Sequence, residues 1–129
     1  MQYLNALDAI INRGIAGVKE SYRDEPHKRD GSLEGFEACR NKTPQELLAI
    51  LNTAGDKTKQ ARQDQHDGKI SMQDYWKIRH AEVQIEWVCN CVSVILCNQG
   101  HESPFPRHVG PTARAASLVA SIVGVAAPD

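Results

Sequence analysis

The sequence predicts an all-α fold, a single helical-bundle domain over residues 1–129. Apolar residues recur at helical spacing through most of the chain, and no alternating run bounded by turn residues indicates a strand. A length of 129 residues is sufficient for one hydrophobic core without disulfides or metals. Helices joined by short connections pack as antiparallel neighbours. We therefore expect an up-and-down bundle of four main helices at about 2–22, 44–66, 71–99 and 112–126, plus a short helix near 33–41.

The first helix, over residues 2–22, is predicted from one continuous apolar stripe. Its members are Leu4, Leu7, Ile11, Ile15, Val18 and Tyr22. Gly14 and Gly17 would each weaken this helix by up to about 1 kcal/mol relative to alanine. We interpret both glycines as positions where a neighbouring backbone comes close.

Residues 23–31 are predicted to form a solvated loop, because the segment is dense in charge and contains Pro26 and Gly31. Ser32 then has the side chain of a helix cap. We expect it to start the short helix near 33–41, with Phe36 and Cys39 facing inward.

The helix over 44–66 has the clearest start signal in the chain. Thr43, Pro44 and Glu46 have the spacing of a capping box with proline at the first helical position. At the other end, Gly68 is expected to adopt a left-handed conformation, and Ser71 is expected to cap the next helix. This short turn predicts an antiparallel pair of long helices.

The stretch 71–99 organises the rest of the chain because it is apolar on two opposite faces. One broad face carries Ile78, Ala81, Ile85, Val88, Cys89, Val92, Ile95 and Leu96, and the opposite stripe carries Met72, Trp76, Val83, Trp87 and Val94. A helix of this kind must bury both faces. We expect it to be central, with the tryptophan stripe covered either by the same chain or by a second subunit.

The last helix, over 112–126, follows an irregular loop at 100–111 that contains three prolines. Thr112 is its predicted cap, and its small-residue edge permits close packing on the central helix. Neither this helix nor the mainly apolar part of the central helix, 88–97, reaches the roughly 20 apolar residues that a membrane span needs. We expect no membrane partner.

The chain is nearly neutral overall and is therefore not a strongly basic protein. The chain has 15 Lys+Arg against 16 Asp+Glu, so we expect no nucleic-acid partner. No positively charged start with a hydrophobic signal region precedes the cysteines, which predicts a cytoplasmic protein with reduced thiols.

The sequence contains no standard catalytic or metal-binding motif. Cys89 and Cys91 would point about 200° apart on a helix, and Cys97 in a third direction, so we expect buried, inert thiols and no zinc site. The turn at Gly68 has glutamines where a calcium loop needs carboxylates. We interpret His80 as structural, with a general base as the alternative. We assign no cofactor and no catalytic residue, and enzymatic activity is left open with a preference against it.

Two function hypotheses follow. The first is a non-enzymatic protein-interaction or regulatory module that forms a homodimer through the stripe Trp76, Val83, Trp87 and Val94. The alternative is a small-ligand-binding protein or enzyme with an anion site between the 23–43 and 100–111 loops, which up-and-down pairing would bring to one end of the bundle. Its predicted residues are His101, Arg107, His108, His27, Arg29 and Arg40.

Overall fold

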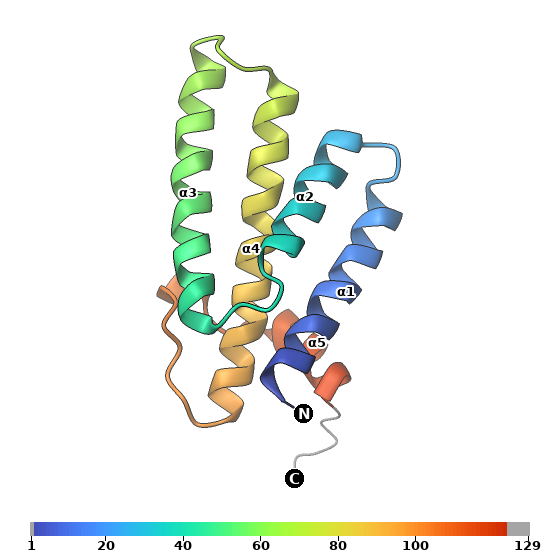
Figure 1. The fold of residues 1–129 in the computed structure, drawn as a ribbon, viewed down its shortest axis with the longest axis vertical. Helices are drawn as coiled ribbons and strands as arrows, with labels where there is room; N and C mark the ends of the chain where they lie inside the picture. The colour runs from blue at the N-terminus through green and yellow to red at the C-terminus, as the bar shows by residue number, and fades with distance from the viewer. Residues whose placement is uncertain (1, 124–129) are drawn as a thin grey trace.

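The computed structural model describes residues 2–123 and confirms the all-α bundle. The elements are α1 (Tyr3–Ser21), α2 (Pro26–Ala38), α3 (Pro44–His66), α4 (Met72–Asn98), the short 3-10 helix η1 (Arg107–Val109) and α5 (Ala113–Val123). Figure 1 shows α1 to α4 running alternately up and down. Within the described range there is no strand. The predicted end of the last helix, 124–126, lies outside the described residues.

The structure corrects the prediction for residues 23–41. The expected loop at 23–31 is largely helical, since α2 begins at Pro26 and ends at Ala38. Ser32 is therefore inside the helix, fully buried, and not its cap. Proline is well tolerated in the first turn of a helix, where its missing N–H is not needed. Packing against α4 is the other reason that this segment is helical.

Two glycines of α2 make this packing possible. Gly31 and Gly35 lie one turn apart, and a methyl group at either position would overlap the backbone of α4, at Lys77 and Ala81 respectively. The two helix backbones therefore touch directly, which only glycine allows. The burial gained by this contact outweighs the weak helix propensity of the segment.

Local signals at the other helix ends are confirmed. The Glu46 backbone N–H donates to Thr43 Oγ1 at 3.1 Å, and the Thr43 N–H donates to Glu46 Oε1 at 2.8 Å, which completes the capping box. The Asp74 N–H donates to Ser71 Oγ at 3.0 Å, and Gly68 has a positive φ of 75°. In α1 the expected close approach occurs only at Gly14, where the Phe36 ring and not a backbone lies against the helix.

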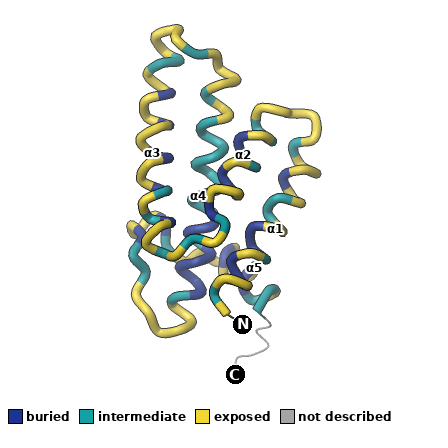
Figure 2. Tube along the Cα trace, viewed as in Figure 1, coloured by how far each residue is buried: buried dark blue, intermediate teal, exposed yellow. Residues whose placement is uncertain are grey.

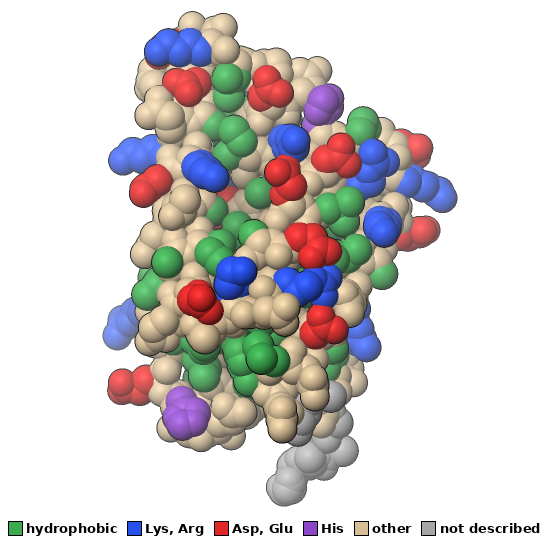
Figure 3. Space-filling model, in the orientation of Figure 1, with side chains coloured by type: hydrophobic (Ala, Val, Ile, Leu, Met, Phe, Trp, Pro, Cys, Tyr) green, Lys and Arg blue, Asp and Glu red, His purple; other side chains and the backbone are tan. Residues whose placement is uncertain are grey.

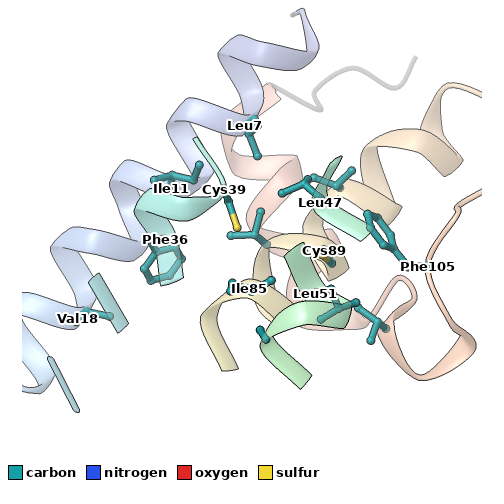
Figure 4. Close-up of a cluster of buried hydrophobic side chains, with 14 residues drawn as sticks. Leu7, Ile11, Val18, Phe36, Cys39, Leu47, Leu51, Ile85, Cys89 and Phe105 are labelled. Carbon is teal, nitrogen blue, oxygen red and sulfur yellow. The ribbon is translucent and has the colours of Figure 1, made fainter. Parts of the chain in front are cut away.

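The central position of α4 is confirmed, because α1, α2, α3, α5 and η1 all contact it. The larger core cluster joins α1, α2, α3 and α4, and Figure 4 shows Leu7, Cys39 and Leu47 meeting beside α4. A second cluster lies between α1, α4 and α5. Its buried members are Ala6, Ile10, Cys91, Val94, Ile95, Ala115 and Val119. Figure 2 shows the lower half of α4 buried and the upper part of the α3–α4 hairpin more exposed.

No helix in the described part of the chain is both long enough and apolar enough to cross a membrane.

Candidate functional site

The structure does not bring the six predicted anion-site residues together. His101, Arg107 and His108 are exposed in the connection between α4 and α5, whereas His27 and Arg29 lie in the first turn of α2. Figure 1 shows the α1–α2 turn and the α4–α5 connection at opposite ends of the molecule. The separation follows from the length of α2, which places its first turn far from its end.

Arg40, the sixth residue, is held in contacts within the chain. Its guanidinium donates to Glu37 Oε1 at 2.7 Å and to Asn12 Oδ1 at 3.1 Å, and it also pairs with Asp8. The Glu37 and Asp8 contacts raise the pKa of Arg40 further above its ordinary value, with Glu37 as the larger cause. Arg40 therefore ties α1 to the end of α2.

The predicted interface stripe divides into a covered part and an exposed part. Val94 is 5 % exposed and lies in the cluster that α5 covers. Trp87 is half-buried and packs against both core clusters. Val83 is also half-buried, whereas Trp76 is 39 % exposed. The chain itself thus covers the lower half of this face of α4, because α5 reaches no further.

A concavity lies on the opposite side of α4, where α2 and α3 diverge. We name it the α2–α3–α4 groove, and its volume is about 610 Å³. Figure 3 shows hydrophobic side chains gathered in the middle of this face, with basic and acidic side chains around them. The lining residues are Glu34, Gly35, Ala38, Ala49, Ile50, Thr53, Ala54, Lys57, Lys77, Ile78, Ala81 and Ile85.

The groove owes its depth to small side chains on all three helices. Gly35 and Ala54 are buried in its floor beside Ile85, and Ile50 and Ile78 are half-buried in its walls. Because α3 and α4 are antiparallel, Lys57 and Lys77 both lie toward the hairpin end of the groove. Glu34 pairs with Lys77 at 3.4 Å at that same end. The groove is therefore apolar along its length and charged at one end.

A second concavity, the α1–α4–α5 cleft, has a volume of about 520 Å³. It opens over the tryptophan stripe at the point where α5 stops covering α4. The lining residues are Gly14, Gly17, Val18, Ser21, Tyr22, Phe36, Val83, Gln84, Glu86, Trp87, Asn90 and Arg114. The Arg114 guanidinium lies 5.4 Å from the centre of the Trp87 ring.

A charged network borders this cleft on α4. Arg79 donates to Glu82 at 2.7 Å and lies 3.6 Å from Glu86. Burial, together with the neighbouring Glu82 carboxylate, raises the pKa of Glu86. The negatively charged form of Glu86 is therefore destabilised, and a further cation nearby would stabilise it.

His80 is enclosed by aromatic rings. Its ring meets Tyr22 edge-on at 5.3 Å between centroids, and Trp76 at 5.7 Å. Burial is the main cause that lowers the pKa of His80, and the nearby cations Lys28 and Arg79 lower it further. Its Nδ1 is buried and has no partner within the described part of the chain. This environment favours the neutral imidazole.

The cysteines carry no metal site. Cys39, Cys89 and Cys91 are buried, and burial raises the pKa of Cys39 and Cys91 to about 12. Cys97, expected to be buried, is exposed instead, because it lies in the last turn of α4 beyond the core. Among residues 2–123 no group of three or more His, Cys, Asp or Glu side chains is arranged to hold a metal ion.

Neither concavity was predicted from the sequence. A signal for the groove was present, since Gly31 and Gly35 have the spacing at which two helix backbones approach. No sequence signal indicated the cleft, because its existence depends on where α5 begins relative to α4.

No protein-family model matches this chain, and no curated protein and no solved structure matches it either.

Proposed function

We propose that this protein is a small non-enzymatic binding protein whose ligand is an aliphatic carboxylate held in the α2–α3–α4 groove. The observation that carries the proposal is the polarity of the groove, with isoleucine and small side chains along its length and two lysines at one end. An aliphatic chain would lie along the apolar part. Its carboxylate would meet the lysines at the hairpin end.

The size of the groove supports a small-molecule ligand. Its volume of about 610 Å³ lies within the roughly 300–1,000 Å³ of typical ligand pockets. The part of α3 that lines the groove runs from Ala49 to Lys57, a length of about 12 Å at 1.5 Å per residue. Each methylene group buried there would contribute about 0.8 kcal/mol. A chain of the length of decanoate suits these dimensions.

The charges support an anionic head group. Lys57 has no carboxylate partner among residues 2–123. Lys77 pairs with Glu34, but both side chains are largely exposed, so the pair is weak and can reorganise. One net positive charge therefore remains at the hairpin end of the groove.

Isothermal titration with decanoate, decan-1-ol and decylamine tests the proposal. The three share one aliphatic chain and differ in the charge of the head group. We expect decanoate to bind most tightly and decylamine least. Equal affinity for all three would show that the lysines do not recognise a head group, and no binding of any of them would refute the groove as a site for aliphatic ligands.

Two substitutions locate the site. Ala49→Trp places a large ring at the rim of the groove from an exposed position, so it should abolish binding without disturbing the core. Lys57→Glu should weaken decanoate binding by about tenfold, which corresponds to the loss of one charge-assisted contact. Lys59→Glu is the matched control, since Lys59 is an exposed lysine on α3 outside the groove.

Self-association is a second candidate function, favoured by the exposed end of the tryptophan stripe. Met72 and Trp76 are 48 % and 39 % exposed and lie one turn apart on α4. Light scattering over a range of protein concentrations should show a dimer that Trp76→Glu converts to a folded monomer. Trp76 is the suitable position because Trp87 contributes to the core. A wild-type monomer at all concentrations would exclude this candidate.

A cytoplasmic location stays a prediction. It is supported by four cysteines that are all free thiols.

A further inference from the structure

The α1–α4–α5 cleft contains two opposite charges that are not paired with each other. Glu86 of α4 and Arg114 of α5 both line the cleft. Among residues 2–123, the only ion-pair partner of Glu86 is Arg79, and Arg114 contacts the Trp87 ring and no carboxylate. The two charges remain separate, on different walls.

Two amide side chains of α4, Gln84 and Asn90, also line the cleft. The amide nitrogen of Gln84 donates to Ser32 Oγ at 3.3 Å, and that of Asn90 donates to the Gly110 carbonyl at 2.8 Å. Each amide keeps its carbonyl oxygen and one N–H free to bind a ligand. Asn90 lies one turn from Glu86 on α4, whereas Gln84 is two residues from Glu86 and points to another side of the helix. Together, the Asn90 carbonyl oxygen and the Glu86 carboxylate make the α4 wall suited to an ammonium group. The guanidinium of Arg114 makes the α5 wall suited to a carboxylate.

The cleft also offers space and apolar surface between these walls. A side chain at Gly17 would meet no atom within 4 Å, so the α1 side of the cleft is open. Val83, Trp87 and Tyr22 line it with aliphatic and aromatic surface. Its volume of about 520 Å³ accommodates a compact molecule such as a free amino acid.

We infer that the α1–α4–α5 cleft is a binding site for a zwitterion, an α-amino acid with a nonpolar side chain. Its ammonium group contacts the Glu86 carboxylate and the amide oxygen of Asn90. Its carboxylate contacts Arg114, and its side chain lies against Val83 and Tyr22. This site lies on the opposite side of α4 from the groove and does not depend on the function proposed for the groove.

The electrostatics of Glu86 support this assignment. The Glu82 carboxylate and burial both raise the pKa of Glu86, so its charged form is destabilised. A bound ammonium group would stabilise that charged form. Arg114 is exposed and its side chain can turn from the Trp87 ring toward a ligand carboxylate.

Tryptophan fluorescence provides the test. The chain has two tryptophans, so the Trp76→Phe variant leaves Trp87 as the single reporter in the cleft. Each common α-amino acid is titrated first, and the tightest is then compared with its amide, which lacks the carboxylate, and with its deaminated acid, which lacks the ammonium group. For leucine these analogues are leucinamide and 4-methylpentanoate. We expect each analogue to bind at least about tenfold more weakly than the amino acid.

Two variants assign the charges. Arg114→Gln should remove the advantage of the amino acid over its amide, and Glu86→Gln should remove its advantage over the deaminated acid. Arg13→Gln is the matched control, since Arg13 bonds to Ser121 outside the cleft and should leave affinity unchanged. Arg114 is exposed, so its variant keeps the test valid if Glu86→Gln alters folding.

Three outcomes would overturn the inference. The first is that no amino acid changes the fluorescence of Trp87 or the melting temperature at millimolar concentration. The second is that the amide binds as tightly as the amino acid, which would reduce the cleft to a cation site. The third is that Arg114→Gln leaves the affinity for the amino acid unchanged.

Discussion

Gly31 of α2 lies against the backbone of α4 at Lys77, and the contact leaves no room for a methyl group at position 31. Gly35 makes the same contact with Ala81 one turn further along. This pair fixes how close α2 comes to α4. It thereby sets one wall of the α2–α3–α4 groove.

Gly31→Ala is expected to destabilise the protein. A gain of up to about 1 kcal/mol in helix propensity is exceeded by an overpacking cost of about 1–3 kcal/mol, because the clash is with backbone that cannot rotate away. Urea denaturation measures the change in the free energy of unfolding. Gly17→Ala is the control, since its added methyl group meets no atom and should stabilise α1. Equal effects at the two positions would contradict the close approach.

Thr43→Ala is expected to lower the free energy of unfolding by about 1 kcal/mol, the usual value for a helix cap. Thr43 bonds reciprocally with Glu46 at the start of α3. Thr53→Ala, at an exposed position inside the same helix, should be neutral or slightly stabilising because alanine has the higher helix propensity. Thermal melting of both variants provides the comparison. A Thr43 variant as stable as wild type would show that the box contributes nothing.

His80 is expected to make stability depend on pH. Burial lowers its pKa in the folded state, so the unfolded state binds a proton more readily. The stability that neutral His80 contributes is therefore fully present above the unfolded pKa of about 6.5. It is lost as the pH falls through the lower pKa of the folded state. The facing charges Lys28 and Arg79 act in the same direction, and Glu25 opposes them.

His80→Phe should flatten this pH dependence while keeping an aromatic ring beside Tyr22. Urea denaturation from about pH 7.5 to about pH 5 measures how the free energy of unfolding changes with pH. This slope reports the difference in bound protons between the unfolded and folded states. His66→Gln replaces an exposed histidine and serves as the control. Glu86, whose pKa is raised, is present in all variants and contributes in the opposite sense as pH falls. An unchanged slope in His80→Phe would assign the pH dependence to other groups.

The two tryptophans are expected to differ in their effect on stability. Trp87→Ala should cost about 2–4 kcal/mol, because the ring packs against both core clusters and its removal leaves a cavity. Trp76→Ala should cost less than about 1.5 kcal/mol, since Trp76 is partly exposed and contacts chiefly Lys28, Tyr75 and His80. Chemical denaturation of both variants tests this order. A larger loss of stability in Trp76→Ala than in Trp87→Ala would contradict the packing described for the two rings.

The sequence by itself determined the helices whose signals are local. Apolar periodicity located α1, α3, α4 and the start of α5, and the side chains of Thr43 and Ser71 marked helix ends correctly because caps act within three residues. The double-faced pattern of 71–99 also determined that α4 is central, since two apolar faces require cover on both sides.

Only the tertiary structure decided the extent of α2, the covered part of the tryptophan stripe and the position of both concavities. Pro26 and Gly31 read locally as breakers, yet they lie in a helix because direct contact with α4 stabilises it. The six residues of the predicted anion site are divided by that same helix. The groove lies where α2 and α3 diverge, and the cleft lies beside the first turn of α5. Such spaces depend on distances between helices that no local pattern of residues encodes.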